Sequence, residues 1–591
     1  MNNKLFTPWG QTLSTQQPLP EYPRPQLKRD SYLNLNGPWD YAICANFQLP
    51  RHFDGQIIVP FSPESLLSGV GRQLKPEEVL WYRRKFSLPE NFCPSGGRVL
   101  LHFGAVDQVA DVYVNGQEVA HHEGGYLPFS ADITSALREG KNSLTVRVLD
   151  SLLDNPYAYG KQKYKRGGIW YTATSGIWQT VWLEAVPETY IQSLRITPDF
   201  DHDAVQFQVK LSCPASVRIQ IADAAGKDAG YGRCDESGQC TISLSRPHPW
   251  TPEDPHLYQV VLTAGDDRVE SYFGLRKFST MDYQGHKVLA LNNRPYFHNG
   301  LLDQGYWSDG LYTPPSDEAM IHDIRTAKEL GYNMLRKHIK IEPLRWYYHC
   351  DRLGMLVWQD MVSGGDELSV WVSQILPFLG RHLKDGRYKR FGRRSPLSRR
   401  IFLQDMEQTV EHLYNCTSLA VWVPFNEGWG QFDALLIAQR LHGLDPTRSI
   451  DHASGWHDQG GGDMKSCHVY YRPVRIRSDN VRVLALTEFG GYSLPVRQHH
   501  SGKLEFGYRI YRTKALYVKA LQRLYQQEVI PLIESQGLSA AIYTQLSDVE
   551  DELNGLMTFD RQVQKVSPEE LRPLLEQLRF STVPTEAGEE R

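Results

Sequence analysis

The sequence lacks several features that would assign it to a class at once. Its eight cysteines form no Cys-x-x-Cys pair, and no Cys/His group has zinc-ligand spacing. No apolar run is long enough to span a bilayer. The opening MNNKLFTPWGQ has no charged region followed by an apolar one, so no secretory signal is expected. These absences favour a cytoplasmic protein with reduced thiols, no zinc site and no membrane partner.

An excess of charge of one sign is also missing. The 591 residues carry 64 Lys and Arg against 68 Asp and Glu, a net charge of −4, so no general attraction to nucleic acid is expected. Aromatic residues are abundant, with 14 Trp and 31 Tyr. Such rings serve as stacking platforms in sugar-binding clefts, or as core in β domains.

Short strands separated by turns make up most of the chain from residue 32 to about residue 280. Residues 1 to about 30 are polar and proline-rich, which suits a peripheral arm packed on the body. The strands that follow, with the hairpin signal VNG at 114–116, predict a jelly-roll sandwich, and we expect a first domain over 1–186. Period-two alternation from Val205 to Leu262 predicts a small immunoglobulin-like sandwich over 187–281.

From residue 282 to 591 the pattern changes to alternating strand and helix. Ser316 is expected to cap a helix that ends at Gly331, and Pro343 to take the first position of a helix that ends at Gly354. Eight candidate strands are present, and eight such units predict a (β/α)8 barrel. They span 296–300, 333–338, 355–360, 419–427, 448–453, 467–471, 483–489 and 539–546.

Two glutamates lie at the carboxyl ends of predicted barrel strands, where active sites of this fold are built. Glu427 ends the fourth strand in LAVWVPFNE, and Glu488 ends the seventh in LTEFGG. Strands four and seven lie on opposing parts of the ring, so the two carboxylates can face each other across its mouth. Glycosidic bond hydrolysis requires such a pair. Asn426, directly before the acid, can bind a sugar hydroxyl. The alternative is that both acids form structural salt bridges.

With these motifs the sequence resembles glycoside hydrolase family 2, which includes β-galactosidases, β-glucuronidases and β-mannosidases. The resemblance covers about residues 30 to 565 and also includes the domain order. It rests on LNLNGPWDYAI, VYVNG, SGIWQTVWLE, FHNG, the NE pair and TEFG.

The resemblance implies a retaining, exo-acting hydrolase of a terminal β-linked sugar, with no cofactor, and it allows a homodimer. Glu427 matches the general acid/base, whose pKa should be raised by burial and by the Glu488 charge, and Glu488 matches the nucleophile. The carboxyl groups should lie about 5–5.5 Å apart. The residues expected to contact or support substrate are Asn426, His338, Tyr470, Trp429, Trp456, His468, Gln545 and Asp360. The tryptophans could instead be loop packing, and His468 a core histidine.

Three departures from the family pattern bear on the substrate. The stretch EDELNGLMTFD lacks the Asn-x-Lys element of family β-glucuronidases, which counts against a glucuronide. Trp170 stands where family β-galactosidases have an aspartate, and WQDMVSGG differs from their magnesium-binding segment. The resemblance therefore implies no metal and leaves the sugar open.

One local segment is strongly basic. Residues 381–400 contain nine Lys or Arg and one Asp, and they follow the third barrel strand on the expected catalytic face. This segment could attract an acidic oligosaccharide or a partner subunit, or it could be a solvated loop. A nucleic-acid-binding role has no recognised module to support it. The second functional reading is a carbohydrate-binding protein on an inactive barrel.

Overall fold

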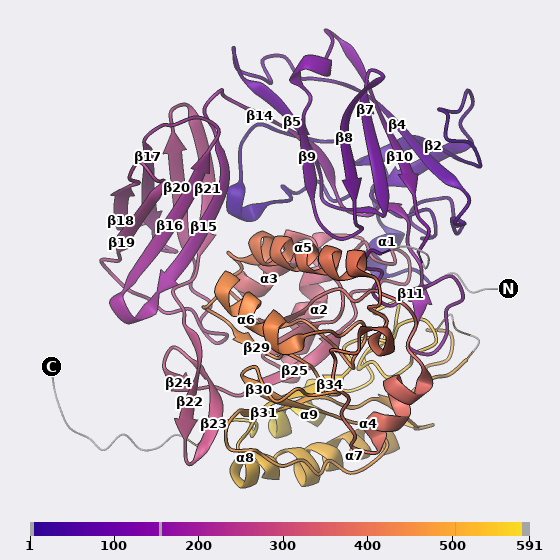
Figure 1. Ribbon diagram of the computed structural model, residues 1–591, viewed down its shortest axis with the longest axis vertical. Helices are drawn as coiled ribbons and strands as arrows, with labels where there is room; N and C mark the ends of the chain where they lie inside the picture. The colour runs from indigo at the N-terminus through magenta and orange to yellow at the C-terminus, as the bar shows by residue number, and fades with distance from the viewer. Residues whose placement is uncertain (1–4, 153–155, 501, 503, 582–591) are drawn as a thin grey trace.

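The computed structural model describes residues 5–152, 156–500, 502 and 504–581. Two β-sandwiches and a barrel form the molecule (Figure 1), with the first sandwich at the top, the second at the left and the barrel below. This arrangement confirms the predicted fold class.

The first sandwich consists of a four-stranded and a six-stranded sheet. The first sheet has the order β1 (Tyr32–Asn34), β14 (Val181–Val186), β5 (Arg98–Phe103) and β9 (Phe129–Asp132). The second has the order β3 (Gly55–Val59), β2 (Gly37–Cys44), β4 (Val79–Ser87), β10 (Lys141–Leu149), β7 (Val109–Val114) and β8 (Gln117–Glu123). The predicted hairpin joins β7 to β8, and Asn115 and Gly116 both have positive φ, as a tight two-residue turn requires.

The second sandwich also has two sheets. One contains β15 (Ile191–Asp199), β16 (Ala204–Leu211) and β19 (Gln239–Ser243). The other contains β18 (Asp228–Arg233), β17 (Val217–Ala222), β20 (Tyr258–Ala264) and β21 (Asp267–Phe273). The expected domain limit at 281/282 falls inside β22 (Phe278–Tyr283), which pairs with β23 (His286–Leu291) and, through it, with β24 (Arg294–Pro295).

The N-terminal arm packs against all three domains. Arg24 forms an ion pair with Glu184 of the first sandwich, and Arg29 donates two 2.8 Å hydrogen bonds to Asp267 of the second. The backbone N–H and hydroxyl of Thr7 both donate to Asp309 of the barrel domain at 2.8 Å.

The barrel contains all eight predicted strands, paired in parallel. Their order is β29, β28, β27, β26, β25, β34, β31, β30, which is a barrel open between β29 and β30. Their bounds are β25 (His298–Asp303), β26 (Met334–Lys337), β27 (Leu356–Asp360), β28 (Leu419–Val423), β29 (Ser449–Ile450), β30 (Met464–Val469), β31 (Val483–Gly490) and β34 (Leu538–Thr544).

Helices cover most of the barrel strands. Ser316 caps α2, as predicted, by accepting from the Ala319 N–H, and Gly331 ends it in the left-handed conformation. Pro343 was predicted at the first position of α3, but it is the N-cap with extended ψ, and Leu344 begins the helix. The helices are α2 (Asp317–Leu330), α3 (Leu344–Leu353), α4 (Leu376–Phe378), α5 (Pro396–Leu413), α6 (Ala434–Leu444), α7 (Lys514–Leu524), α8 (Pro531–Gln536) and α9 (Pro568–Leu575). Residues 451–463 and 470–482, all described, contain loops in place of helices.

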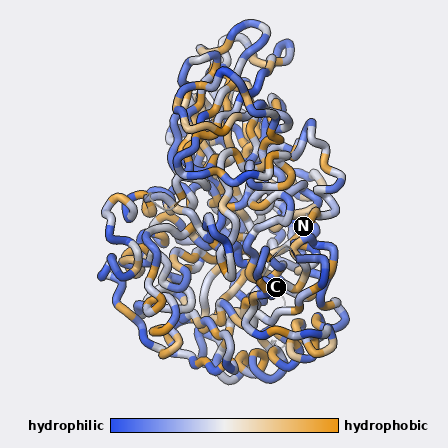
Figure 2. Tube along the Cα trace, turned by 90° about the vertical axis from the view of Figure 1, so that its right-hand side faces the viewer, coloured by the Kyte–Doolittle hydropathy of each residue, from blue (hydrophilic) through white to orange (hydrophobic). Residues whose placement is uncertain are grey.

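Hydrophobic and hydrophilic stretches alternate along the trace in both lobes of the molecule (Figure 2). Within the barrel, Met334, Trp358, Val421 and Ile542 from four strands pack into one buried cluster. The barrel is thus a filled core whose carboxyl end is free to carry a site.

Across the described part of the chain, no helix has the length and apolar character needed to cross a membrane.

Candidate active site

Glu427 lies just beyond β28 in a backbone conformation that is rare for residues other than glycine. Its φ is +50°, and its N–H donates to the Ser454 carbonyl at 3.0 Å. Such strained residues persist where the surrounding structure fixes them, and they cluster at functional sites. The side chain is buried, with 7% of the residue exposed. The turn therefore fixes this carboxyl group at the mouth of the barrel.

Glu488 lies within β31 and is also buried, with 4% of the residue exposed. One carboxylate oxygen accepts a short hydrogen bond from the Tyr470 hydroxyl. The other accepts from the Arg336 guanidinium at 3.3 Å. Both donors stabilise the ionised form of this carboxylate.

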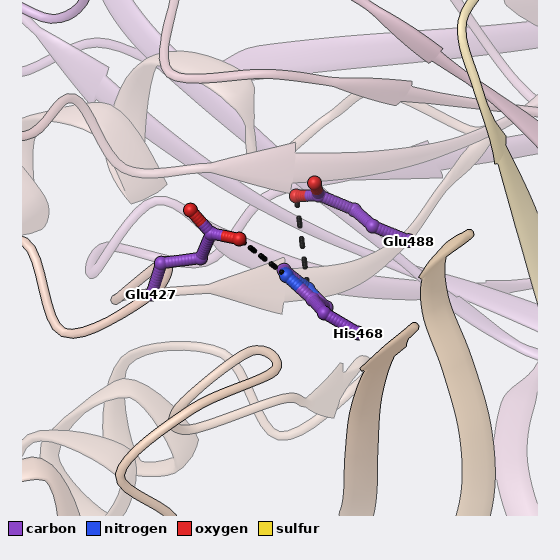
Figure 3. A group of neighbouring side chains, drawn as sticks. All are labelled: Glu427, His468 and Glu488. Carbon is purple, nitrogen blue, oxygen red and sulfur yellow. Dashed lines mark hydrogen bonds and ion pairs between the residues drawn. The ribbon is translucent and has the colours of Figure 1, made fainter. Parts of the chain in front are cut away.

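His468, from β30, lies between the two glutamates (Figure 3). Its Nδ1 is 2.9 Å from Glu427 Oε1, and its Nε2 is 3.6 Å from Glu488 Oε1. One carboxylate oxygen of each glutamate and one nitrogen of His468 all lie within 4.8 Å of one another. This separation agrees with the spacing of about 5–5.5 Å that retaining hydrolases use, and is shorter than the 6.5–9.5 Å of inverting ones.

The environments of the two glutamates push their pKa values apart. Burial raises the pKa of Glu427, and the nearby Glu488 charge adds to this, although the hydrogen bond from His468 opposes it. Burial also disfavours the ionised form of Glu488, but the basic groups around it outweigh burial and lower its pKa. These are His468 and His338, which are positive only when protonated, and Arg336 and Lys161. Of these, Arg336 is charged at any working pH, so we regard it as the decisive one. The site therefore pairs a carboxyl group that keeps its proton to higher pH with a carboxyl group that ionises more readily.

Arg336 organises the floor of the site, and sequence reasoning missed it. This fully buried residue of β26 donates to both oxygens of Asp360, at 2.9 and 3.1 Å, and to Asn426 Oδ1 at 2.9 Å. Asp360 in turn lies 2.6 Å from His338 Nδ1. The network orients Asn426 so that its buried Nδ2 has no hydrogen-bond partner among the described residues. That amide is available to a ligand hydroxyl.

Gln545 is buried, and both ends of its amide are held by protein groups. Its oxygen accepts from Gln304 at 2.7 Å, and its nitrogen donates to Asn554 at 2.9 Å. Its direct contact with substrate stays a prediction.

Aromatic rings line a cavity of about 510 Å³ that opens from Glu427 and Tyr470. Trp429 lies on its wall and stacks on Trp170 of the first sandwich with 5.1 Å between ring centroids. Trp456 lies on the wall near Phe378. The rings that sequence reasoning did not assign to the site are Tyr159, Trp170, Phe378, Tyr471, Phe506 and Tyr508. Tyr471 ends the sixth predicted strand, so the sequence offered a signal for it. The other rings come from loops and from helix α4, outside the predicted strands, so strand-end reasoning could not find them.

The first sandwich closes one side of this cavity through residues 158–172. The N–H groups of Tyr159 and Gly160 both donate to the Ser363 carbonyl of the barrel, at 3.1 and 2.9 Å. Thr172 donates to Glu550 through its N–H at 3.0 Å and its hydroxyl at 2.6 Å. These contacts fix the segment over the barrel mouth.

Glu427, His468 and Glu488 also have the donor types and separation that could hold a metal ion. A metal ion there would compete with the hydrogen bond between His468 Nδ1 and Glu427 and with the contact between His468 Nε2 and the Ser454 hydroxyl. The expectation that no metal is required stays a prediction, which chelation tests below.

The basic segment 381–400 lies beside the site, after β27, but its charges are not equivalent. Arg393 is buried and donates to Gly430 at 3.0 Å and to the Ser398 hydroxyl at 2.7 Å, so it holds the loop after Glu427. Asp385 is buried and accepts from Gln431 at 3.2 Å. Most other basic residues of the segment are exposed. Recruitment of an acidic substrate or partner by them stays a prediction.

Comparison with known proteins agrees with the geometry. Three models of glycosyl hydrolases family 2 match the chain: the sugar binding domain over 71–187, the family domain over 189–276 and the TIM barrel domain over 286–479. Glu427 lies inside the last match, and Glu488 lies beyond it.

Individual relatives are distant. The chain is 26% identical to a β-galactosidase of Aeromonas hydrophila over 416 residues, which are 66% of this chain and 37% of the relative. It is 26% identical to a putative β-glucuronidase of Formosa agariphila over 304 residues, which are 48% of this chain and 34% of the relative. The chain thus spans little more than a third of the length of either.

The fold also matches solved structures. A β-glucuronidase from an uncultured Clostridium species superposes with a TM-score of 0.73 at 15% identity, covering 93% of this chain and 99% of the other. From the matching family models in their expected order, the chain belongs to glycoside hydrolase family 2.

Proposed function

We propose that this protein is a retaining glycoside hydrolase that removes a terminal β-linked sugar. Glu427 is the general acid/base and Glu488 is the nucleophile. The observation that carries the proposal is the pair of buried carboxyl groups within 4.8 Å whose pKa values are displaced in opposite directions. Double displacement needs one proton donor and one ionised nucleophile at this separation.

In the first step, ionised Glu488 attacks the anomeric carbon. The bond to the leaving oxygen breaks, and Glu427 gives its proton to that oxygen. Tyr470 stays protonated because burial, together with the Glu488 charge, raises its pKa well above the ordinary value. It therefore serves as a hydrogen-bond donor that holds Glu488, and Arg336 holds the same carboxylate from the other side.

In the second step, water hydrolyses the glycosyl ester. Esterification removes the negative charge of Glu488, and with it one of the influences that raise the pKa of Glu427. Glu427 then accepts a proton from water as the water attacks the anomeric carbon. The unpartnered Asn426 amide is placed to bind a hydroxyl of the sugar in both steps.

Exo action is supported by the shape of the site. Glu427 lines a cavity that is closed on one side by residues 158–172 of the first sandwich, and Glu488 lies buried next to Glu427. A chain end can enter such a cavity, whereas an internal sugar would need two exits. The β-galactosidase and β-glucuronidase names of the relatives favour a β-linked sugar and do not choose between sugars.

Hydrolysis of a panel of p-nitrophenyl α- and β-glycosides tests the proposal. The panel includes galactoside, glucuronide, mannoside, glucoside, arabinoside and glucosaminide. We expect wild type to cleave a β-glycoside (or an α-L-arabinopyranoside, which presents equivalent stereochemistry) and Glu488→Ala to cleave none. Sugar binding without turnover, on the panel and on β-linked oligosaccharides, would instead identify an inactive carbohydrate-binding protein. A homodimer and a cytoplasmic location stay predictions, which light scattering and fractionation can check.

A further inference from the structure

Lys161 is a buried cation in segment 158–172, supplied to the barrel by the first sandwich. Only 6% of the residue is exposed. Its ammonium lies 5.6 Å from the ring centroid of Trp429 and 5.7 Å from that of Tyr171. Both distances are within cation–π range, so the rings compensate part of its charge. These ring contacts are not conventional hydrogen bonds, so the three N–H donors of the Lys161 ammonium stay available for an acceptor.

The other buried lysines of the described chain are all paired. Lys337 lies 2.6 Å from Asp303, Lys340 lies 2.9 Å from Glu342, and Lys565 lies 2.6 Å from Asp548. Within the described residues, Lys161 has neither an ion pair nor a hydrogen bond from its ammonium. A buried charge without a partner is costly. We therefore expect a ligand to supply the hydrogen-bond acceptor that the Lys161 ammonium lacks.

Lys161 lies next to the cavity that opens from Glu427, because its chain neighbours Tyr159 and Gly160 and the Trp429 ring that it contacts all line that cavity. Burial raises the pKa values of Glu427 and Asp360, and the Lys161 charge is one of the influences that act against it. The pKa of His338 is lowered by burial first and by Lys161 next. His338 uses Nδ1 for Asp360 and has no described partner at Nε2. Two nitrogen atoms without described protein partners therefore lie near the catalytic glutamates: the Lys161 ammonium, a donor, and His338 Nε2, which accepts in the neutral imidazole whose Nδ1–H donates to Asp360.

The segment that carries Lys161 is rigidly anchored on both sides. Glu550 binds Thr172 and, at 2.8 Å, Arg166, while Glu552 accepts from the Tyr171 hydroxyl. On the other side the Gly160 N–H donates to Ser363. The ammonium is therefore held in place before a ligand arrives, as a specificity contact requires.

We propose that Lys161 is a specificity-determining residue that binds an anionic substituent, a carboxylate or a sulfate ester, on the sugar that Glu488 attacks. This inference rests on the proposed function. Lysine suits either anion because its charge is compact and its three donors rotate. A neutral sugar would leave the buried ammonium unpaired, so the site would discriminate against it.

Kinetics of three proteins test this proposal. We would compare wild type, Lys161→Met and Lys165→Met, the last as a control because Lys165 is an exposed lysine of the same segment. The substrates are p-nitrophenyl β-glucuronide, β-galacturonide and 6-sulfo-β-galactoside with their neutral parents. We expect wild type to prefer at least one anionic substrate by about 10- to 100-fold in kcat/KM, the range for a hydrogen bond to a charged group. Lys161→Met should abolish this preference, Lys165→Met should retain it, and Lys161→Arg should keep part of it.

Equal losses on anionic and neutral substrates in Lys161→Met would overturn the proposal and make Lys161 a residue that only tunes Glu488. Preference of wild type for every neutral parent would overturn it as well. Failure of this proposal can be distinguished from failure of the proposed function by calorimetry. We would measure the binding of free glucuronate, galacturonate, galactose 6-sulfate and the neutral sugars. An inactive protein that binds an anionic sugar more tightly, and loses that preference only in Lys161→Met, supports the proposal. Absence of such a preference contradicts it.

Discussion

Replacing Glu488 with Gln should lower the pKa of Glu427 by a predictable amount. The substitution keeps the shape of the side chain and removes its negative charge, as esterification does during the reaction. The two carboxylates have oxygens within 4.8 Å of each other. At an effective dielectric constant of about 20, two unit charges at this distance interact by ~3.5 kcal/mol. Since one pKa unit is ~1.36 kcal/mol, the pKa should fall by ~2.5 units.

The direction follows from the sign of the charge. A negative neighbour favours the protonated form of Glu427, so its removal favours the ionised form and lowers the pKa. Burial, the largest influence that raises the pKa, persists in the variant. Infrared difference spectra can follow the protonation of the Glu427 carboxyl. The spectrum of wild type minus that of Glu427→Gln isolates this carboxyl in the wild-type background. The spectrum of Glu488→Gln minus that of the double variant isolates it when the Glu488 charge is absent. An unchanged pKa would mean that the two groups do not interact, and the change of Glu427 from acid to base would lose its cause.

Three further outcomes are expected. Glu427→Ala should lower kcat by about 10²–10⁴-fold for substrates with poor leaving groups. Azide should restore turnover of activated glycosides and give a β-glycosyl azide as the product. A loss of activity that does not depend on the leaving group would contradict the acid role. Tyr470→Phe keeps the ring that stacks 3.8 Å from Tyr508 but removes a donor to Glu488, so the pKa of Glu488 should rise and the acid limb of kcat/KM should move to higher pH, with little change in melting temperature. Incubation with EDTA should leave kcat/KM unchanged, and a loss restored by one divalent ion would instead assign a metal to Glu427, His468 and Glu488.

Local signals in the sequence were sufficient for much of the fold. The hairpin at Asn115 and Gly116 depends on two adjacent residues that tolerate positive φ. Helix α2 depends on the Ser316 cap and the Gly331 end. The α3 boundary was wrong by one residue because Pro343 suits both the N-cap and the first helical position, and the side-chain pattern does not separate them.

The proximity of Glu427 and Glu488, the proposed catalytic pair, was predictable because the barrel topology itself brings strand ends together. The partners of that pair were not. In the sequence, nothing distinguishes Arg336 from any other charged residue of a predicted strand. Only the fold shows that Asp360, Glu488 and Asn426 surround it. Lys161 lies in another domain, more than 260 positions before Glu427. Its approach to the site depends on the packing of segment 158–172, which periodicity does not encode.

Covalent labelling of Glu488 tests the proposed mechanism most directly. Wild type and Glu488→Gln would be incubated with the 2-deoxy-2-fluoro analogue, with an activated leaving group, of the glycoside that the panel identifies. Intact mass and peptide mapping would follow. We expect one sugar adduct on the wild-type peptide that contains Glu488, none on the variant, and a first product with the β configuration. Turnover that gives an inverted product, or an adduct on another residue, would contradict the assignment of Glu488 as the nucleophile.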